Sequence, residues 1–487
     1  MSWSFPGRIP ARVLALVMAL ILLVPARPAS ALTYEDERAM GRQVLVAVKK
    51  HTKLVDDQVI NDYVRQLGQK IVRAIGPQPF EYQFFVIESG VLNAFAVPGG
   101  YVFLHSETIN AMESEGQVAA ILCHEIAHVA GRHIANRIAR SRAVSLAALA
   151  GLMAGILIGG QAGAALMMGS MGGGMQAMLA YSREDEQEAD LRGTDFLVQA
   201  GYDPRFMASS FQVMLKKAYY GSTGIPTYLN THPGLSERIG AVEAAVKAHP
   251  GYGRVLGRGD EKAFRAIKDR VMALLADPNR ARNYFEARLK QDRGSGSGHY
   301  GLAMLHHREQ RYEQAVKELN LALKVEPANA NYLTDLGAIL YQKRDMDGAL
   351  NALGKAVVLR PHFGRALFLL GQVYEEKGLM DQAQLYYERA LVEDPDNAQT
   401  LFHLGNLYGR RGDLARAHLH TGLYFKAEGE MGKAMYHLEK AKENAAAAPP
   451  DVRERIDSAI TAIKKDKKEP KGNEPNTPPR AVTKMLP

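Results

Sequence analysis

Two histidines four residues apart, with a glutamate directly after the first, are the residues of this chain best suited to chemistry. They lie in the stretch Cys123-His124-Glu125-Ile126-Ala127-His128. An α-helix turns by about 100° per residue, so His124 and His128 share one face and can bind one metal ion. Glu125 lies beside them and can accept a proton from a water molecule at that ion. The H-E-x-x-H pattern therefore predicts a zinc hydrolase site on a helix.

The sequence around the motif predicts the helix that such a site needs. Ser114 and Gln117 have the spacing of a capping box, and the residues after them, to about Arg140, are rich in Ala, Ile and Val without a proline. We therefore expect a single helix that carries both histidines and extends to about residue 140. Cys123 is the only cysteine, which excludes an intramolecular disulfide.

A catalytic zinc normally has three protein ligands, so one ligand remains to be found. His133 is one residue short of the position that the longer motif H-E-x-x-H-x-x-G-x-x-H requires, which Ile134 occupies. We therefore expect His133 on the helix surface or behind a metal ligand. Further along the chain, an acidic stretch of helical composition runs from Arg183 to Gly193.

Within this acidic stretch, Glu186 and Asp190 are four residues apart and share a helix face. Glu186 could bind the zinc, while Asp190 reaches a ligand histidine or donates a proton at the reaction centre. A solvated acidic helix start is the plainer interpretation. Spacing alone does not choose among Glu184, Glu186 and Glu188 as the ligand.

Patterns before the motif predict the elements that position it. Residues 32–79 are helical in pattern, whereas residues 82–87 and 101–104 have the β-branched and aromatic content of strands. Between them, residues 93–97 read as an extended piece and residues 98–100 as a turn. A strand exposed at the cleft could pair with a substrate chain. An ordinary core sheet is an equal alternative.

The uncharged run at residues 143–182 has two interpretations. Its length could supply two membrane spans of ~20 residues each. The nine glycines between Gly151 and Gly174 favour instead a buried helix followed by an apolar flap over the active site. Such a flap could touch a membrane or an unfolded protein.

The first 31 residues have the pattern of a cleavable export signal. Arg8 and Arg12 precede an apolar run of about 12 residues, and Ala29-Ser30-Ala31 ends the segment. A retained membrane anchor is the alternative, although a span needs ~20 residues. The formal charge is +8, and three arginines of the signal and a net +4 in residues 464–487 account for +7 of it. The nearly neutral remainder argues against nucleic-acid binding.

The second half of the chain repeats every 34 residues. This period, with small residues where paired helices touch, predicts tetratricopeptide repeats, whose stacked pairs leave a concave groove for an extended partner. Gly422 and Ala434 follow the matching Gly405 and Ala417 by only 17 residues, which predicts extra helices that cap the array. The positions that repeat are Pro327, Pro361 and Pro395, Gly337, Gly371 and Gly405, and Ala349, Ala383 and Ala417.

Composition and pattern predict a mainly α chain with two domains and a tail. The glycine- and serine-rich residues 293–298 are the expected flexible junction between the domains. The expected parts are a signal peptide (1–31), an α+β zincin-type metalloprotease domain with a small sheet (32–250), connecting helices and a linker (251–295), an α-helical tetratricopeptide solenoid (296–446), and a C-terminal helix with a disordered basic tail (447–487).

H-E-I-A-H followed about sixty residues later by E-x-x-x-D resembles the gluzincin peptidases that include HtpX and the CAAX prenyl proteases. The resemblance covers roughly residues 35–250 and implies one Zn²⁺ per chain. It implies that Glu186 is the third zinc ligand beside His124 and His128. It also implies that Glu125 is the catalytic base and that Asp190 assists catalysis.

The same resemblance implies roles for Thr231-His232-Pro233 and for Arg238. His232 is expected near the zinc, where it occupies the open position in a resting state or stabilises the oxyanion. Arg238 is expected to face the cleft and could also stabilise the oxyanion. A turn histidine and a surface arginine are the plainer alternatives.

The export signal, the metal site and the repeats, in this order, resemble the BepA-like periplasmic proteases. The resemblance implies a periplasmic zinc endopeptidase that hydrolyses misfolded or stalled outer-membrane β-barrel proteins. The repeats would recruit these clients or the β-barrel assembly machinery, with possible peripheral membrane contact and no nucleic acid. One alternative is a chaperone or assembly-factor binding module in which proteolysis is secondary. Another is a membrane-integrated protease that uses residues 143–182 as a hairpin.

Overall fold

The computed structural model describes residues 32–140, 155, 181–220, 228, 231–249 and 257–468. The predicted signal, nearly all of the uncharged run at 143–182 and the tail after residue 468 lie outside this part of the chain. Within the part that is described, no helix is long and apolar enough to cross a membrane.

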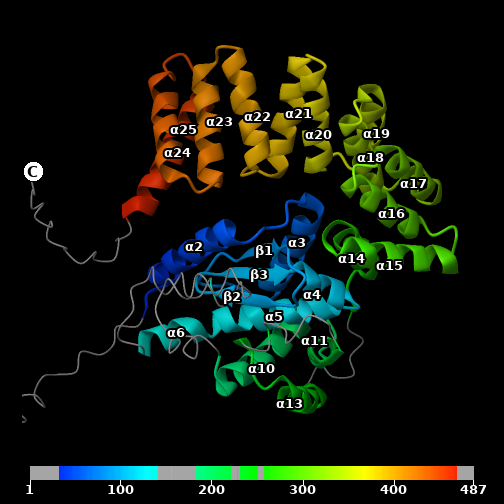
Figure 1. Ribbon diagram of the computed structural model, residues 1–487. Coiled ribbons are helices and arrows are strands. Elements are labelled where there is room, and N and C mark those ends of the chain that lie inside the picture. Colours follow the sequence, from blue (N-terminus) through cyan, green and yellow to red (C-terminus); the bar gives the residue numbers. More distant parts are fainter. Residues whose placement is uncertain are drawn as a thin grey trace, which may run out of the picture.

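The N-terminal half combines a small sheet with helices, as the sequence predicts (Figure 1). The order of elements also follows the predicted order, with two helices before the sheet and the motif helix after it. Its strands are β1 (Gln83–Ile87), β2 (Ala94–Val97) and β3 (Tyr101–His105). Its helices are α2 (Tyr34–His51), α3 (Gln58–Ala74), α4 (Ser106–Ala111), α5 (Glu115–Ala130), α6 (His133–Arg140), α10 (Arg183–Gln199), α11 (Arg205–Tyr220) and α13 (Leu235–Ala248).

The three strands form one sheet in the order β1-β3-β2. β1 and β3 are parallel, and β2 is antiparallel to β3. Side chains of β3 alternate between two cores. Tyr101 and Phe103 pack with α2, whereas Val102 and Leu104 pack with α3 and α5. The sheet therefore carries the motif helix on one face and α2 on the other.

The motif helix α5 begins where the sequence predicts. The Ser114 hydroxyl caps it by accepting a hydrogen bond from the Gln117 amide. The Gln117 side chain accepts from the amide of Glu113, so only the first half of the predicted capping box is formed at Ser114.

The motif helix ends earlier than expected. α5 stops at Ala130, the chain turns at Gly131 and Arg132, and α6 starts at His133. Arg132 has a φ of 54°, a left-handed conformation that an α-helix does not contain. The expected single helix to residue 140 is therefore wrong.

The C-terminal half consists of helical hairpins, and two helices connect it to the first half (Figure 1). The connecting helices are α14 (Glu261–Leu275) and α15 (Pro278–Gln291). The hairpins are built from α16 (Gly296–Arg308), α17 (Tyr312–Val325), α18 (Ala330–Gln342), α19 (Met346–Leu359), α20 (Gly364–Glu376), α21 (Met380–Glu393), α22 (Ala398–Arg410), α23 (Leu414–Ala427), α24 (Met431–Glu443) and α25 (Pro450–Lys468).

The expected flexible junction at residues 293–298 is only partly present. The Ser295 hydroxyl accepts a hydrogen bond from the Gly298 amide and caps α16, which begins at Gly296. Residues 296–298 are therefore helical, because a serine cap stabilises a helix start despite the glycines that follow.

Glycines of the repeats allow the helices of each pair to touch. A side chain at Gly371 would lie 2.5 Å from the ring of Tyr387, sixteen residues later. Gly405 and Thr421 make the same contact between α22 and α23, and Gly422 and Leu438 make it between α23 and α24. α23 thus serves two successive pairs, which explains the 17-residue step in the sequence.

The repeats arch over α2 and α3, while α10 and α13 lie on the opposite side of the N-terminal half (Figure 1). Val59 of α3 packs in a cluster with Leu333 and Phe363 of the repeats. At the far end of the arch, the Lys49 ammonium group donates to the carbonyl of Ala427 at 3.4 Å. The two halves are therefore in contact along the arch.

Candidate metal centre

Four side chains converge at one point beside the motif helix. Each of His124, His128, Glu186 and His232 offers one ligand atom, and these atoms lie within 4.8 Å of one another. The Nε2 atoms of His124 and His128 are 3.0 Å apart, and Nε2 of His128 is 3.4 Å from a Glu186 carboxylate oxygen. All four side chains are buried. This is the one such group among the residues that the structure describes.

The two helices that supply the group lie against each other. His124 and His128 come from successive turns of α5, and Glu186 comes from the first turn of α10. Gly193 of α10 allows the close approach, because a side chain there would lie 3.1 Å from the backbone of His124. Ser182 starts α10 with a full capping box.

Burial distinguishes among the three glutamates that spacing left open. Glu186 is fully buried, whereas Glu184 and Glu188 are exposed. Burial raises the pKa of Glu186, but His232 and His128 outweigh this effect and hold the pKa well below its ordinary value. Glu186 is therefore a carboxylate that faces the histidines.

Glu125 is also part of α5 and lies next to this group. No other side chain among the described residues donates a hydrogen bond to its carboxylate. Both of its oxygens are buried and without a side-chain partner, and the nearest ring nitrogen is Nε2 of His232 at 3.6 Å. The backbone amide of Ala96, in β2, interacts with the carboxylate. Burial raises the pKa of Glu125, and the nearby His232 and His124 oppose this rise.

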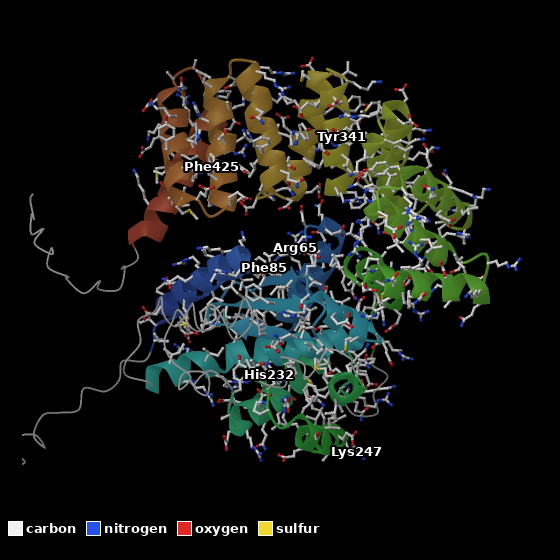
Figure 2. All side chains as sticks on the ribbon, in the orientation of Figure 1. Arg65, Phe85, His232, Lys247, Tyr341 and Phe425 are labelled. Atoms are coloured by element: carbon white, nitrogen blue, oxygen red, sulfur yellow. The ribbon has the colours of Figure 1, made fainter. Side chains whose placement is uncertain are left out.

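His232 completes the group from a segment that is distant in the sequence. Its Nδ1 is 2.9 Å from a Glu186 oxygen and 3.3 Å from Nε2 of His124. Burial lowers the pKa of His232, but the carboxylates of Glu186 and Glu125 outweigh this effect and raise the pKa. Figure 2 shows His232 on the side of the domain opposite the repeats.

Asp190 and Arg238 lie directly behind the group. An oxygen of Asp190 is 3.0 Å from Nδ1 of His124. The Arg238 guanidinium group donates two hydrogen bonds to Asp190, of 2.8 and 2.6 Å, and also contacts Glu186. Arg238 is buried, and its guanidinium group lies over the ring of Phe211. It is thus paired with two carboxylates instead of being open to a cleft.

Three further residues line the site, and two of them, both tyrosines, have no clear signal in the sequence. The ring of Tyr181 stacks on the ring of His128, with 3.7 Å between the ring centroids. The ring of Tyr228 stacks on the ring of His232, with 4.2 Å between the centroids. His133 is buried, with its Nδ1 2.9 Å from Nδ1 of His128. The expected place of His133 behind a ligand matches this contact, whereas a helix-surface position is wrong. Tyrosines next to a motif are common, so no pattern could have selected these two.

The chemistry of the group suits a divalent metal ion. Histidine nitrogens and one carboxylate oxygen are the donor types that zinc prefers in hydrolase sites. Burial holds the pKa of His128 well below its ordinary value, which keeps its imidazole neutral, as a ligand must be. Nε2 of His232 is buried without a hydrogen-bond partner among the described residues. These residues therefore form a possible metal-binding group.

Comparison with known families divides the chain in the same way. Residues 59–246 match peptidase family M48. Residues 275–332, 308–362 and 334–398 match tetratricopeptide repeats, as do residues 386–419. These matches confirm the predicted combination of a metallopeptidase with a helical repeat array.

Several curated proteins are similar to parts of this chain. The beta-barrel assembly-enhancing protease of Escherichia coli strain K12 is 29% identical over 313 residues, which cover 62% of this chain and 63% of the relative. A putative beta-barrel assembly-enhancing protease of Vibrio cholerae is 30% identical over 311 residues, with coverage of 62% and 63%. The mitochondrial metalloendopeptidase OMA1 of Schizosaccharomyces pombe is 31% identical over 182 residues, which cover 37% of this chain and 51% of the relative.

The chain spans 63% of the length of the two bacterial relatives that it matches. The two family matches cover different parts of the chain, and the arrangement of helices differs between these parts. Residues 59–246 match peptidase family M48, and most of the helical hairpins that follow, to residue 419, match tetratricopeptide repeats.

Proposed function

We propose that this protein is a zinc-dependent endopeptidase. The observation that carries the proposal is the convergence of His124, His128 and Glu186 from two helices, with Glu125 buried in the same helix as the two histidines. The peptidase family M48 match supports the same activity, as do the names of the relatives, one a protease and one a metalloendopeptidase.

In this proposal, His124, His128 and Glu186 hold one zinc ion. Zinc, when bound, supplies a Lewis acid that polarises the peptide carbonyl and makes a water molecule acidic at neutral pH. Asp190 orients His124 from behind, and Arg238 holds Asp190 and Glu186 in place. His232 occupies the position beside Glu125 at rest.

Glu125 is the general base of the proposed reaction. Its raised pKa favours a group that accepts a proton from the attacking water and returns it to the leaving amine. His232 must move away from this position before a peptide enters, because it now fills the space beside Glu125. Once displaced, His232 could donate to the developing oxyanion.

The substitution Glu125→Gln tests the activity. It keeps the size of the side chain and the three proposed ligands but removes the base. We expect bound zinc, measured by mass spectrometry of the purified protein, to stay at one ion per chain. Cleavage of unfolded β-casein should fall by about 10²–10⁴-fold.

Glu184→Gln is the matched control, since Glu184 is an exposed glutamate at the start of α10. It should leave both zinc content and cleavage unchanged. Unaltered cleavage by the Glu125→Gln protein would exclude the proposed mechanism, and a wild-type protein without zinc would exclude the metal site.

The proposed substrates are misfolded or stalled outer-membrane β-barrel proteins in the periplasm. The predicted export signal at residues 1–31 supports the compartment, and the names of the bacterial relatives support the substrate class. We assign hydrolysis to residues 32–250 and docking of clients or of the β-barrel assembly machinery to residues 296–446. Incubation with an unfolded outer-membrane β-barrel protein and with its folded form tests this choice, since only the unfolded form should be cleaved.

A chaperone is the second candidate function, and two observations favour it. The site is closed, because Glu125 and His232 are fully buried. The repeats also expose apolar side chains at equivalent positions, with Val358 and Val392 exposed by 81% and 76%. If the Glu125→Gln protein still suppresses aggregation of an unfolded β-barrel protein, and Val358→Ser abolishes this effect, the chaperone function is supported.

A further inference from the structure

His133 lies directly behind His128, which is one of the three proposed zinc ligands. The Nδ1 atoms of the two rings are 2.9 Å apart, and the ring planes meet at 82°. Tyr181 stacks on the face of the same His128 ring. His128 is thus held by a hydrogen bond along its edge and by an aromatic ring on its face.

The turn between α5 and α6 is built to place His133 there. Arg132 adopts a φ of 54°, which is unfavourable for a residue with a side chain. The buried carboxylate of Glu37 accepts a hydrogen bond of 2.7 Å from Arg132 and stabilises this conformation. Gly131 leaves the necessary space, because any side chain there would overlap the His133 ring. The helix break therefore returns His133 towards His128.

Metal binding by His128 determines the protonation of both rings. His128 can offer Nε2 to a metal ion only when its ring is neutral and carries its proton on Nδ1. That proton points at Nδ1 of His133, which must accept it. His133 then carries its own proton on Nε2, which lies 3.4 Å from the carboxylate of Glu188. The hydrogen bond therefore runs from His128 to His133, and the far nitrogen of His133 lies near the Glu188 carboxylate.

We propose that His133 is a positioning residue that fixes the ring orientation and the proton of His128 for zinc. The inference rests on the proposed function, since it assumes a zinc ion at His128. It gives the two ligand histidines different support: His124 has the buried carboxylate of Asp190 at 3.0 Å, whereas His128 has the ring of His133, which lies near the half-exposed Glu188. Such partners typically change metal affinity by 10–100-fold.

Two substitutions at His133 separate hydrogen bonding from packing. His133→Asn keeps an oxygen that can accept the His128 proton, and His133→Leu keeps the bulk but no acceptor. Zinc affinity is measured by competition with a chromophoric chelator. We expect His133→Leu to bind zinc about 10–100-fold more weakly and His133→Asn to stay within about threefold of the wild type. Thermal unfolding of the zinc-free proteins is the second measurement.

His420→Leu is the control for loss of a buried histidine far from the site. His420 is equally buried, in α23, and donates to the carbonyl of Arg416. Its loss should lower the unfolding temperature without changing zinc affinity. Equal zinc affinity in wild type, His133→Asn and His133→Leu would overturn the role of His133 while leaving the zinc site intact. A wild type that binds no zinc would instead overturn the proposed function.

Discussion

Arg238 is a buried side chain beside the candidate metal centre, and its contacts hold neighbouring carboxylates in place. It donates to both oxygens of Asp190 and contacts Glu186. Three buried charges in contact are stable only as a group, since each carboxylate would otherwise lack a partner. This arrangement favours Arg238 as the residue that positions the site over a direct role at the oxyanion.

We predict that Arg238→Met destabilises the zinc-free protein by about 3–5 kcal/mol, because it leaves two buried carboxylates without their cation. The measurement is urea unfolding of the zinc-free protein, followed by circular dichroism. Arg238→Lys is the companion variant and should retain part of this stability. If stability is unchanged in both variants while kcat alone falls, Arg238 acts at the oxyanion instead.

Pairs of helices in the repeats depend on single glycines at their contact points. Gly371 of α20 faces the buried ring of Tyr387 in α21. Gly354 also lies within a helix, α19, but a side chain there would meet nothing within 4 Å. The two glycines thus differ in their surroundings and share the same backbone state.

The substitution Gly371→Ala should therefore destabilise the repeats by about 1–3 kcal/mol through overpacking. The same change at Gly354 should stabilise them by about 0.5–1 kcal/mol, because alanine favours the helix and has space. Thermal unfolding of the two variants tests the contrast. A stabilising effect at both positions would show that the α20–α21 contact adapts without cost.

A buried ionic cluster at α14 joins the two halves of the described chain. Arg270 of α14 pairs with Asp57, the capping residue of α3, and with Asp335 of α18. Burial raises the pKa of Asp335, but Arg270 and Arg365 outweigh this effect and hold the pKa far below its ordinary value. Phe264 of α14 packs in the core of the N-terminal half, and Met272 packs in the core of the repeats.

We predict that Arg270→Met uncouples the two halves. It leaves Asp57 and Asp335 without their shared cation, which should cost about 3–5 kcal/mol. Calorimetric unfolding should change from one transition to two, one for each half of the chain.

Arg282→Met is the control, because Arg282 forms a partly exposed pair with Glu309 in the same region. Such a pair contributes about 1 kcal/mol or less, so a single transition should remain. Two transitions already present in the wild type would show that the cluster does not couple the halves.

Much of the fold was predictable because short-range spacing controls it. Residues close together in the sequence predict the strands around residues 82–104 and the cap at Ser114. The 34-residue period is likewise visible in the sequence itself. The break at Arg132 was not predictable, since a left-handed arginine is unfavourable by itself and depends on the distant Glu37.

The candidate site also has residues that the sequence predicts and residues that only the structure reveals. The sequence by itself determined that His124 and His128 share a helix face beside Glu125, because the geometry of one helix imposes it. A resemblance to a family was needed to choose Glu186, and the structure supports that choice through burial.

Only the tertiary structure decided that His133 and Tyr181 lie against His128, that Tyr228 lies against His232, and that Arg238 is paired with Asp190. These contacts join turns and helices that are far apart in the chain. Their positions depend on how α5, α10 and α13 pack, which no local pattern encodes. The chemistry was therefore readable from spacing, whereas the residues that hold it in place depend on packing between distant segments.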